Sequence, residues 1–497
     1  MAGPAPQTSA STLVELLDEV LATDADREAF VEPATPDRAR RVVTFAELAE
    51  RSAALGLWLH RRGVRPGDVV ALQLGNTIEY AVAYHAIVRA GAIATGVNPR
   101  LGPHEIGHIR RMADPVFTFD GPLPALPAGD VAWRAERSPT DPLAIVWTGG
   151  TTGLPKGAWF DTECLRAMAE GAEPLSALGD RRLSPLPFSH VGFMTRAWDE
   201  LAHRITTVIC PTPWAAATTL AVYDAEGITV GQGVPTQYRM LFDHPAFAST
   251  DVGSLRIAGI GAARVQPELV AEMRAKLGCP VVHRYASTES CLATGTRLSD
   301  PPDIVATTVG RPNGRVELKI VDDDGAELAS GETGTICLRS RAMMRGYWGD
   351  AERSAEAIDA DGWLRTGDLG WVGDDGNLRI AGRRTEMYIR GGYNVYPIEV
   401  ENCLGDHVDV AAAAVVGSPV ADRLGEIGVL FVVARPGRHP DLGELRRFTR
   451  ERLADYKAPD VLVVVDSLPL TSIGKIDKKA LQPLADDAAS TWRRPGA

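Results

Sequence analysis

Apolar and polar positions in the first part of the chain follow helical and strand-like patterns in turn. Thr44 and Glu47 form a capping box, and the apolar stripe after them predicts a helix from Thr44 to about Arg62. Short apolar runs then predict strands, and longer amphipathic stretches predict the helices between them. The predicted strands are 69–74, 93–97, 116–119 and 143–147, and the predicted helices are 79–89 and 103–112. Strands that alternate with helices indicate a mostly parallel α/β sheet.

The pattern changes twice further along the chain. Apolar runs at 206–209 and 228–230 continue the alternation, but 317–321 and 335–338 indicate two strands of an antiparallel or barrel-like subdomain. After residue 383 the pattern predicts a helix from Pro397, strands at 408–416, 429–433 and 461–465, and an amphipathic helix at 442–453. The predicted fold class is therefore α/β. It has a large N-terminal domain of parallel α/β sheets with a small β-barrel-like subdomain, and a small α+β C-terminal domain.

The composition narrows the choice of function. The formal net charge is −12, so the chain lacks the basic surface that a general nucleic-acid binder needs. No apolar run reaches membrane-spanning length, and the N-terminus does not have the form of a secretory signal. The six cysteines form no CxxC pair, which favours free thiols in a reducing cytoplasm over a disulfide framework or a zinc site.

A stretch rich in glycine and threonine follows the predicted strand 143–147. It reads Trp147-Thr148-Gly149-Gly150-Thr151-Thr152-Gly153-Leu154-Pro155-Lys156-Gly157. Its glycines allow tight turns that present backbone N–H groups, its threonines add hydroxyl donors, and Lys156 adds a positive charge, so it can hold a polyphosphate. It is not a Walker motif, because Gly157 follows the lysine. A flexible surface loop is the alternative interpretation.

Further short motifs follow in order along the chain. They are Pro187-Phe188-Ser189-His190-Val191-Gly192, Gly259-Ile260-Gly261-Ala262-Ala263, Tyr285-Ala286-Ser287-Thr288-Glu289, Trp363-Leu364-Arg365-Thr366-Gly367-Asp368, the segment 382–401, and Leu468-Pro469-Leu470-Thr471-Ser472-Ile473-Gly474-Lys475-Ile476-Asp477-Lys478-Lys479. Each motif has an ordinary alternative. A lone histidine is more often structural than catalytic, and the residues 475–479 alone are typical of a solvated basic turn.

Taken together, these motifs resemble those of the adenylate-forming superfamily, and most of all those of acyl-CoA synthetases. The resemblance extends from Trp147 to Lys479. It implies an N-terminal adenylation domain at 1–382, a hinge at 383–386, and a mobile C-terminal lid domain at 387–497. Gly149 and Thr385 depart from the residues usual in the family, and Thr385 puts the ease of domain rotation in question.

The resemblance implies a role for each motif. Four residues are implied to be catalytic: Lys475 bridges the attacking carboxylate and the α-phosphate, Thr288 bonds the α-phosphate, Glu289 holds Mg²⁺ together with Thr151, and His190 lies beside the acyl carboxylate. The implied ATP and AMP contacts are Thr148, Gly149, Gly150, Thr151, Thr152, Gly153, Lys156, Gly261, Ala262, Ala263, Tyr285, Ala286, Ser287, Thr288, Asp368 and Arg383. The implied acyl pocket contains His190, Val191, Gly192, Trp198, Gly233, Val234, Ile257 and Gly259. The implied CoA tunnel contains Arg390, Gly391 and Gly392, and the implied hinge contains Arg384, Thr385 and Glu386.

The implied reaction is ATP-dependent formation of an acyl-CoA through an acyl-adenylate, with AMP and diphosphate as products. The expected partners are a small-molecule carboxylic acid, ATP, Mg²⁺ and coenzyme A, in a cytoplasmic monomer or homodimer without nucleic acid or integral membrane contact. Glycines in the implied pocket favour a bulky or cyclic acid. Two alternatives stay open: a ligase that loads the acyl group onto a carrier protein, and a non-catalytic nucleotide-binding paralogue.

Overall fold

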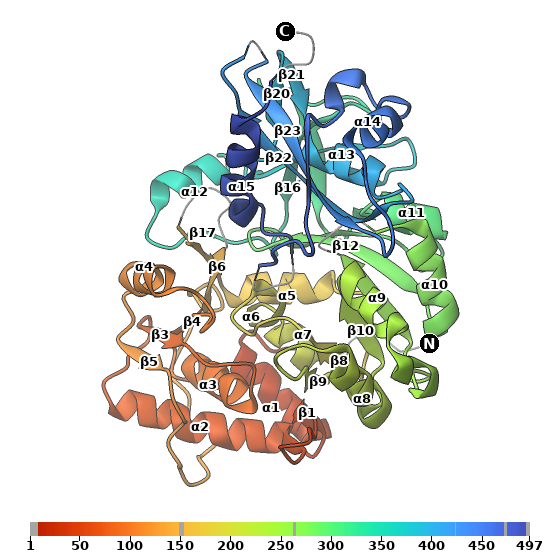
Figure 1. The fold of residues 1–497 in the computed structure, drawn as a ribbon. Coiled ribbons are helices and arrows are strands. Elements are labelled where there is room, and N and C mark those ends of the chain that lie inside the picture. Colours follow the sequence, from red (N-terminus) through yellow and green to blue (C-terminus); the bar gives the residue numbers. More distant parts are fainter. Residues whose placement is uncertain (1–7, 149–153, 262–264, 423, 472–474, 494–497) are drawn as a thin grey trace. The chain divides into compact units, whose positions relative to one another are not determined.

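The structure is a computed structural model that describes residues 8–148, 154–261, 265–422, 424–471 and 475–493 (Figure 1). The chain divides into two compact units. Unit 1 consists of residues 1–318 and 337–366, and unit 2 consists of residues 319–336 and 367–497. The hinge predicted at 383–386 lies inside unit 2 in this division, and the predicted domain boundary stays a prediction.

Unit 1 is built of helices on parallel strands. Its helices in the described residues are α1 (Leu13–Asp24), α2 (Phe45–Arg61), α3 (Ile78–Arg89), α4 (Pro103–Ala113), α5 (Thr162–Glu170), α6 (Val191–Met194), α7 (Ala197–Ala202), α8 (Ala216–Glu226), α9 (Pro235–Asp243), the 3-10 helix η1 (Pro245–Ser249), α10 (Pro267–Leu277), α11 (Pro302–Thr307) and α12 (Ala351–Ala357). Its strands in the same residues are β1 (Glu28–Glu32), β2 (Arg41–Thr44), β3 (Val69–Leu72), β4 (Ile93–Gly96), β5 (Phe117–Phe119), β6 (Ala144–Thr148), β7 (Lys156–Phe160), β8 (Arg181–Ser184), β9 (Thr206–Ile209), β10 (Val230–Gly233), β11 (Ile257–Gly261), β12 (Val281–Ser287), β13 (Cys291–Gly295), β14 (Arg311–Pro312) and β17 (Gly346–Tyr347).

These strands form two mainly parallel sheets within the described residues. One has the order β14-β13-β12-β11-β10-β8-β9-β1-β2, and the other has the order β17-β7-β6-β4-β3-β5. The strands from β12 to β1 in the first sheet pair in parallel, as do β6, β4, β3 and β5 in the second. The antiparallel strands are β2, β13 and β14 in the first sheet and β7 and β17 in the second. The predicted α/β class with parallel sheets is confirmed.

Local sequence explains most of these elements. Thr44 caps α2 by accepting a hydrogen bond from the Glu47 amide over 3.2 Å, as predicted. The same kind of box at Thr12 and Glu15 begins α1, a helix that the sequence analysis did not predict. The strand predicted at 228–230 is found at Val230–Gly233 (β10), because backbone pairing with β11 holds glycines that hydrophobic periodicity does not detect.

Four strands near the boundary of the units form another sheet: β15 (Glu317–Val321), β16 (Gly334–Arg339), β18 (Leu364–Val372) and β19 (Leu378–Arg383). Their order is β15-β16-β18-β19. In the part of the chain that the structure describes, this sheet is open, so the subdomain that was expected to resemble a barrel is a short open sheet.

The rest of unit 2 is a small α+β fold. Its described elements are β20 (Tyr388–Arg390), β21 (Tyr393–Val395), α13 (Pro397–Leu404), β22 (Val410–Pro419), β23 (Glu426–Ala434), α14 (Leu442–Arg450), the 3-10 helix η2 (Asp455–Lys457), β24 (Val461–Val464) and α15 (Lys478–Ser490). Alternate residues of β23 enter two apolar clusters. Leu430 packs with residues of α13 and α14, and Phe431 packs with residues of α15, so helices cover both faces of the sheet β22-β23-β24 (Figure 1).

Candidate active site

The carboxyl ends of neighbouring parallel strands gather several predicted site residues in unit 1. Gly233 pairs with Ile260 at the end of β10, and Gly261 pairs with Arg284 at the end of β11. A Cβ on Gly261 would lie 2.9 Å from the Arg284 carbonyl oxygen, so only glycine fits this backbone contact. Ligands of open α/β sheets bind at this edge of the strands. Ala262 and Ala263 lie outside the described residues.

The predicted metal-binding carboxylate lies in a tight turn after β12. Tyr285, Ala286 and Ser287 end that strand, and Thr288 and Glu289 follow in the turn. The Ser287 hydroxyl accepts a hydrogen bond from the Ser290 amide over 3.0 Å, and the Ser290 hydroxyl accepts one from the Ser287 amide over 3.2 Å. This reciprocal pair fixes the backbone on both sides of Thr288 and Glu289.

Tyr347 holds the Glu289 side chain and was not predicted. Its hydroxyl donates a hydrogen bond to Glu289 Oε1 over 2.9 Å. Burial first, and then the neighbouring carboxylate, raise the pKa of Tyr347 well above its usual value, so the hydroxyl stays protonated and donates. The sequence contained no signal for this contact, because it joins β17 to a turn 58 positions earlier in the chain.

Lys156 lies on a strand and not in a loop. It is the first residue of β7, where it pairs with Thr148 in an antiparallel hairpin. Its ammonium lies 4.7 Å from the centroid of the Tyr347 ring. This cation–π contact keeps the Lys156 side chain beside the tyrosine that bonds to Glu289. Gly149, Gly150, Thr151, Thr152 and Gly153 lie outside the described residues, so their predicted phosphate contacts stay predictions.

His190 is fixed by the helix that follows it. It is the N-cap of α6, and its Nδ1 accepts a hydrogen bond from the Gly192 amide over 3.1 Å. An Nδ1 that accepts leaves the ring proton of a neutral imidazole on Nε2, which is then a hydrogen-bond donor. Val191 and Trp198, both predicted in the acyl pocket, are buried nearby in sequence on α6 and α7.

The glycines of the predicted acyl pocket make room for the protein's own side chains. A Cβ on Gly233 would lie 3.2 Å from Tyr238, and one on Gly259 would lie 3.3 Å from Leu175. Val234 is the N-cap of α9, and Ile257 is buried in a cluster that includes Leu175. These glycines are therefore explained by packing, and a wide acyl pocket stays a prediction.

Unit 2 brings together three predicted residues that are far apart in the sequence. Asp368 on β18 pairs with Arg383 on β19, and Arg383 Nε lies 3.2 Å from Asp368 Oδ1. Burial lowers the pKa of Lys475, and the charge of Arg383 lowers it further, while Asp368 and Glu386 oppose this effect. The ammonium of Lys475 therefore lies within the electrostatic field of Asp368 and Arg383, two of the predicted nucleotide contacts.

Two hydrogen bonds with Thr471 support the backbone of Lys475. Its carbonyl accepts a hydrogen bond from the Thr471 amide over 2.7 Å, and its amide donates to the Thr471 hydroxyl over 3.2 Å. Asp477 then caps α15 by accepting hydrogen bonds from the amides of Lys479 and Ala480. The segment that carries Lys475 is thus attached directly to the start of a helix.

The predicted hinge and CoA-tunnel residues have clear local roles. Arg384, Thr385 and Glu386 form the turn between β19 and β20. Gly391 and Gly392 have φ of +61° and +86° and turn the chain between β20 and β21, so left-handed backbone at both positions requires glycine. Arg390 donates two hydrogen bonds to Asp460, over 2.8 and 2.7 Å. The predicted contact of Arg390, Gly391 and Gly392 with the pantetheine of CoA stays a prediction.

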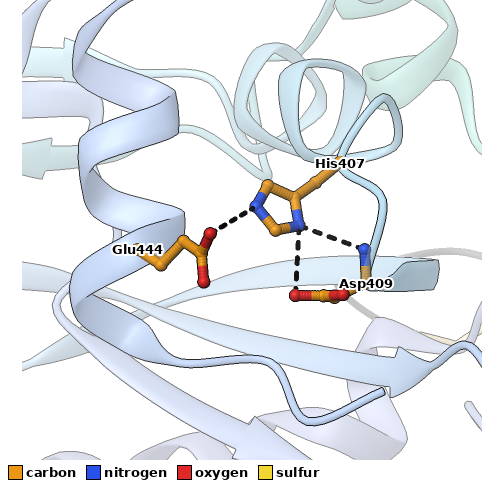
Figure 2. A group of neighbouring side chains, drawn as sticks. All are labelled: His407, Asp409 and Glu444. Carbon is orange, nitrogen blue, oxygen red and sulfur yellow. Dashed lines mark hydrogen bonds and ion pairs between the residues drawn. The ribbon is translucent and has the colours of Figure 1, made fainter. Parts of the chain in front are cut away.

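A histidine and two carboxylates in unit 2 form the group of potential metal ligands found in the described residues. Figure 2 shows His407 between Asp409 and Glu444. Nδ1 lies 4.0 Å from Asp409, Nε2 lies 4.0 Å from Glu444, and Nδ1 also accepts the Asp409 amide proton over 3.2 Å. Because the two carboxylates face different ring nitrogens, the arrangement fits an ionic cluster better than a metal centre. Arg438, 3.6 Å from Asp409, adds to that cluster.

A cavity of about 800 Å³ in unit 1 lies beside α2 and the proline-rich segment 121–128. It contains none of the predicted site residues. Its charged lining already has protein partners, since Glu47 accepts the Thr44 amide proton and Glu79 pairs with Arg41. This cavity is separate from the strand ends that carry the candidate site.

Among the described helices, none is both long and apolar enough to cross a membrane.

Comparison with protein families identifies two that match this chain. Residues 17–132 and 125–348 match the AMP-binding enzyme family, and residues 399–475 match the AMP-binding enzyme C-terminal domain. An indoleacetate–CoA ligase of Aromatoleum aromaticum is 34% identical over 92% of this chain and 97% of its own length. A methyl-dioxo-octahydroindenyl-propanoyl:CoA ligase of Mycobacterium tuberculosis is 37% identical over 89% of this chain and 94% of its own length.

Solved structures agree with these matches. The ATP-bound MatB of Rhodopseudomonas palustris is 27% identical, with a TM-score of 0.86 over 96% of this chain and 99% of that one. The fold is therefore that of the adenylate-forming enzymes. The chain belongs to the AMP-binding enzyme family, and the predicted likeness to acyl-CoA synthetases is confirmed.

Proposed function

We propose that this protein is an ATP-dependent acyl-CoA synthetase, an AMP-forming acid–thiol ligase. The carboxylate of the substrate attacks the α-phosphorus of ATP and diphosphate leaves, which gives an acyl-adenylate. The CoA thiol then attacks the acyl carbon, AMP leaves, and the thioester forms. The observation that best supports this proposal is the gathering of Lys475, Asp368 and Arg383 in unit 2.

The described side chains suit this chemistry. Lys475 places positive charge where the carboxylate and the α-phosphate meet, and charge that is already in place lowers the barrier most effectively. Asp368 offers two carboxylate oxygens to the ribose hydroxyls. His190, with its proton on Nε2, donates a hydrogen bond toward the acyl carboxylate or the phosphate.

Mg²⁺ is the expected metal of this reaction. The residues fit it, because the Glu289 carboxylate is oriented by Tyr347 and hard oxygen ligands suit Mg²⁺. When bound, the ion neutralises the charge of the phosphates. Thr151, the other predicted ligand, lies outside the described residues.

We further propose that the acid carries a ring system. The indoleacetate–CoA ligase and the octahydroindenyl-propanoyl:CoA ligase, both similar along most of this chain, have names that specify ring-bearing acids. A panel of indole, polycyclic and straight-chain acids, scored by diphosphate release with and without CoA, tests this. A strong preference for straight-chain acids would contradict it. Diphosphate release that needs a carrier protein and not CoA would favour the carrier-loading alternative.

The Lys475→Ala variant tests the mechanism. Loss of the ammonium is expected to slow ATP–diphosphate exchange by about 100-fold or more, because the charge acts in the transition state. Thioester formation from supplied acyl-adenylate and CoA should stay close to normal. Lys479→Ala, an exposed lysine on the same segment, is the matched control. Near-normal exchange by Lys475→Ala would show that its assigned role is wrong.

A further inference from the structure

Lys478 begins α15, three residues after Lys475, and contacts two carboxylates. Its Nζ lies 2.9 Å from Glu386 Oε2 and 2.8 Å from Glu401 Oε1. The Lys478 side chain is only 22% exposed. Burial alone lowers its pKa, but the carboxylates, Glu401 foremost, raise the pKa of Lys478 above its usual value. Lys478 is therefore a permanent cation in this position.

One of the two carboxylates belongs to the predicted hinge turn, and the other belongs to the helix α13 that follows it. Glu386 is the last residue of that turn, and Glu401 lies on α13, where it also accepts the Val415 amide proton over 2.8 Å. Glu401 is thus held by the sheet as well as by Lys478. Glu386 has fewer fixed contacts, since its carboxylate is 28% exposed and belongs to a turn. Of the two, Glu386 is the one that can move.

Glu386 also acts on Lys475. Its charge is one of those that raise the Lys475 pKa against the effects of burial and Arg383. One carboxylate therefore lies near two ammonium groups, and in the structure it bonds to Lys478. If Lys478 lost its charge, Glu386 would lose this bond while its charge continued to act on Lys475.

We propose that Lys478 is a positioning residue for adenylation, which holds Glu386 so that this carboxylate does not capture the ammonium of Lys475. The inference rests on the proposed function, in which Lys475 must reach the substrate carboxylate and the α-phosphate. Lys478 does not touch the reacting atoms. It keeps the catalytic charge available and ties the catalytic loop to α13.

A second ion pair on α13 provides a matched control. Lys457 Nζ lies 2.8 Å from Glu399 Oε2, and the lysine side chain is 17% exposed, close to the value for Lys478. The two pairs have similar geometry and burial on the same helix. The Lys457 pair does not include a carboxylate that acts on Lys475, so its loss reports only the structural cost of breaking such a contact.

The experiment compares Lys478→Met, Lys478→Arg, Lys457→Met and the double variant Lys478→Met/Glu386→Gln. Lys478→Met is expected to slow ATP–diphosphate exchange about tenfold, because Glu386 would then bind the ammonium of Lys475 and keep it from the substrate. Thioester formation from supplied acyl-adenylate should stay within about twofold. Lys478→Arg should retain most of the exchange rate, and adding Glu386→Gln to Lys478→Met should restore most of it. Lys457→Met should leave exchange unchanged.

A second measurement does not depend on turnover. Competitive labelling of lysine amines with acetic anhydride, read by peptide mass spectrometry, reports the free-amine fraction of Lys475. At a pH below the pKa of Lys475, the free-amine fraction should be about tenfold smaller in Lys478→Met than in the wild type. The reason is that a carboxylate at close range raises a lysine pKa by about one unit. Glu386→Gln should reverse the change.

The outcomes separate the two proposals. If Lys478→Met impairs both half-reactions equally and Glu386→Gln restores neither exchange nor labelling, the positioning role is wrong and Lys478 is only structural. Exchange and labelling that are unchanged in Lys478→Met would also overturn it. If the wild-type protein forms no acyl-adenylate with any acid, the proposed function fails, while the labelling shift still shows whether Lys478 controls Glu386.

Discussion

Asp199 in unit 1 and Asp368 in unit 2 are both buried aspartates beside arginine. Asp199 on α7 is 0% exposed, and its carboxylate lies 3.0 Å from Arg182, 2.9 Å from Arg196 and 3.0 Å from His203. Asp368 is 10% exposed and pairs with Arg383, whose side chain is 44% exposed. The first carboxylate is enclosed by two arginines and a histidine, whereas the second pairs with a guanidinium that reaches water.

The difference shows how the same pair of residue types is enclosed by packing in one place and stays open to water, as the proposed ribose contact requires, in the other. Burial alone raises the pKa of Asp199, but Arg182, His203 and Arg196 together hold it well below its usual range, so the carboxylate stays charged. A ribose-binding carboxylate must instead exchange a partner for the ligand, which a half-exposed arginine permits at low cost.

The largest effect is expected from Asp199→Asn. The change leaves the guanidinium groups of Arg182 and Arg196 buried without the charge of Asp199. Removing one partner of a buried ion pair typically costs about 3–5 kcal/mol of folding free energy. Urea denaturation followed by tryptophan fluorescence measures it. Asp375→Asn, which breaks a pair with Arg379 on the surface of unit 2, is the control and should cost no more than about 1 kcal/mol. Equal losses in the two variants would remove the distinction between the regions.

The next effect comes from Glu200, the neighbour of Asp199 on α7. Burial raises the pKa of Glu200 to about 7, although Arg182 and the hydroxyl of Thr207, 2.8 Å away, oppose this. In the unfolded chain the carboxyl has its usual pKa of 4.5. Between these values the folded protein holds a proton that the unfolded chain has released, so stability falls as the pH rises from about 4.5 to about 7.

Glu200→Gln should remove this part of the pH dependence. The amide keeps an oxygen for the Thr207 hydroxyl and carries no charge, so the variant should be more stable than the wild type by about 2–3 kcal/mol at pH 8 and nearly equal to it at pH 4.5. Denaturation of both proteins at the two pH values gives the comparison. A constant difference at both pH values would mean that Glu200 is ionised in the folded protein throughout.

Most of the fold could be predicted because hydrophobic periodicity and capping residues are local signals. The helix after Thr44, the strands predicted at 69–74, 93–97, 116–119 and 143–147, and the α+β order after residue 383 appear where the pattern indicates them. Where local signals were weak, prediction failed. Helix α1 begins at a capping box that lies next to an Ala- and Ser-rich start, and β7 was read as part of a glycine-rich loop because Lys156 and Gly157 are poor strand formers.

The candidate site was less predictable, because its supporting contacts join distant parts of the chain. Motif residues such as Asp368 and Arg383 could be named from the sequence, and cross-strand pairing brings these two together. Tyr347 and Lys478 could not be given roles in advance. Their significance comes from contacts with Glu289 and Glu386, and those contacts exist only once β17 and α15 have packed.

The smallest effect on folding, and the clearest test of the contrast between the two aspartates, is expected from Asp368→Asn. Water can cover the half-exposed Arg383, so the free energy of unfolding should change by less than about 1 kcal/mol. The KM for ATP should rise about 10- to 100-fold, since hydrogen bonds to a charged group contribute about 1.5–3 kcal/mol. Calorimetric titration with AMP and initial rates at varied ATP measure the second effect, with Asp375→Asn again as the surface control. A loss of stability as large as that of Asp199→Asn, with unchanged nucleotide affinity, would place Asp368 among the structural aspartates and remove the ribose contact from the proposal.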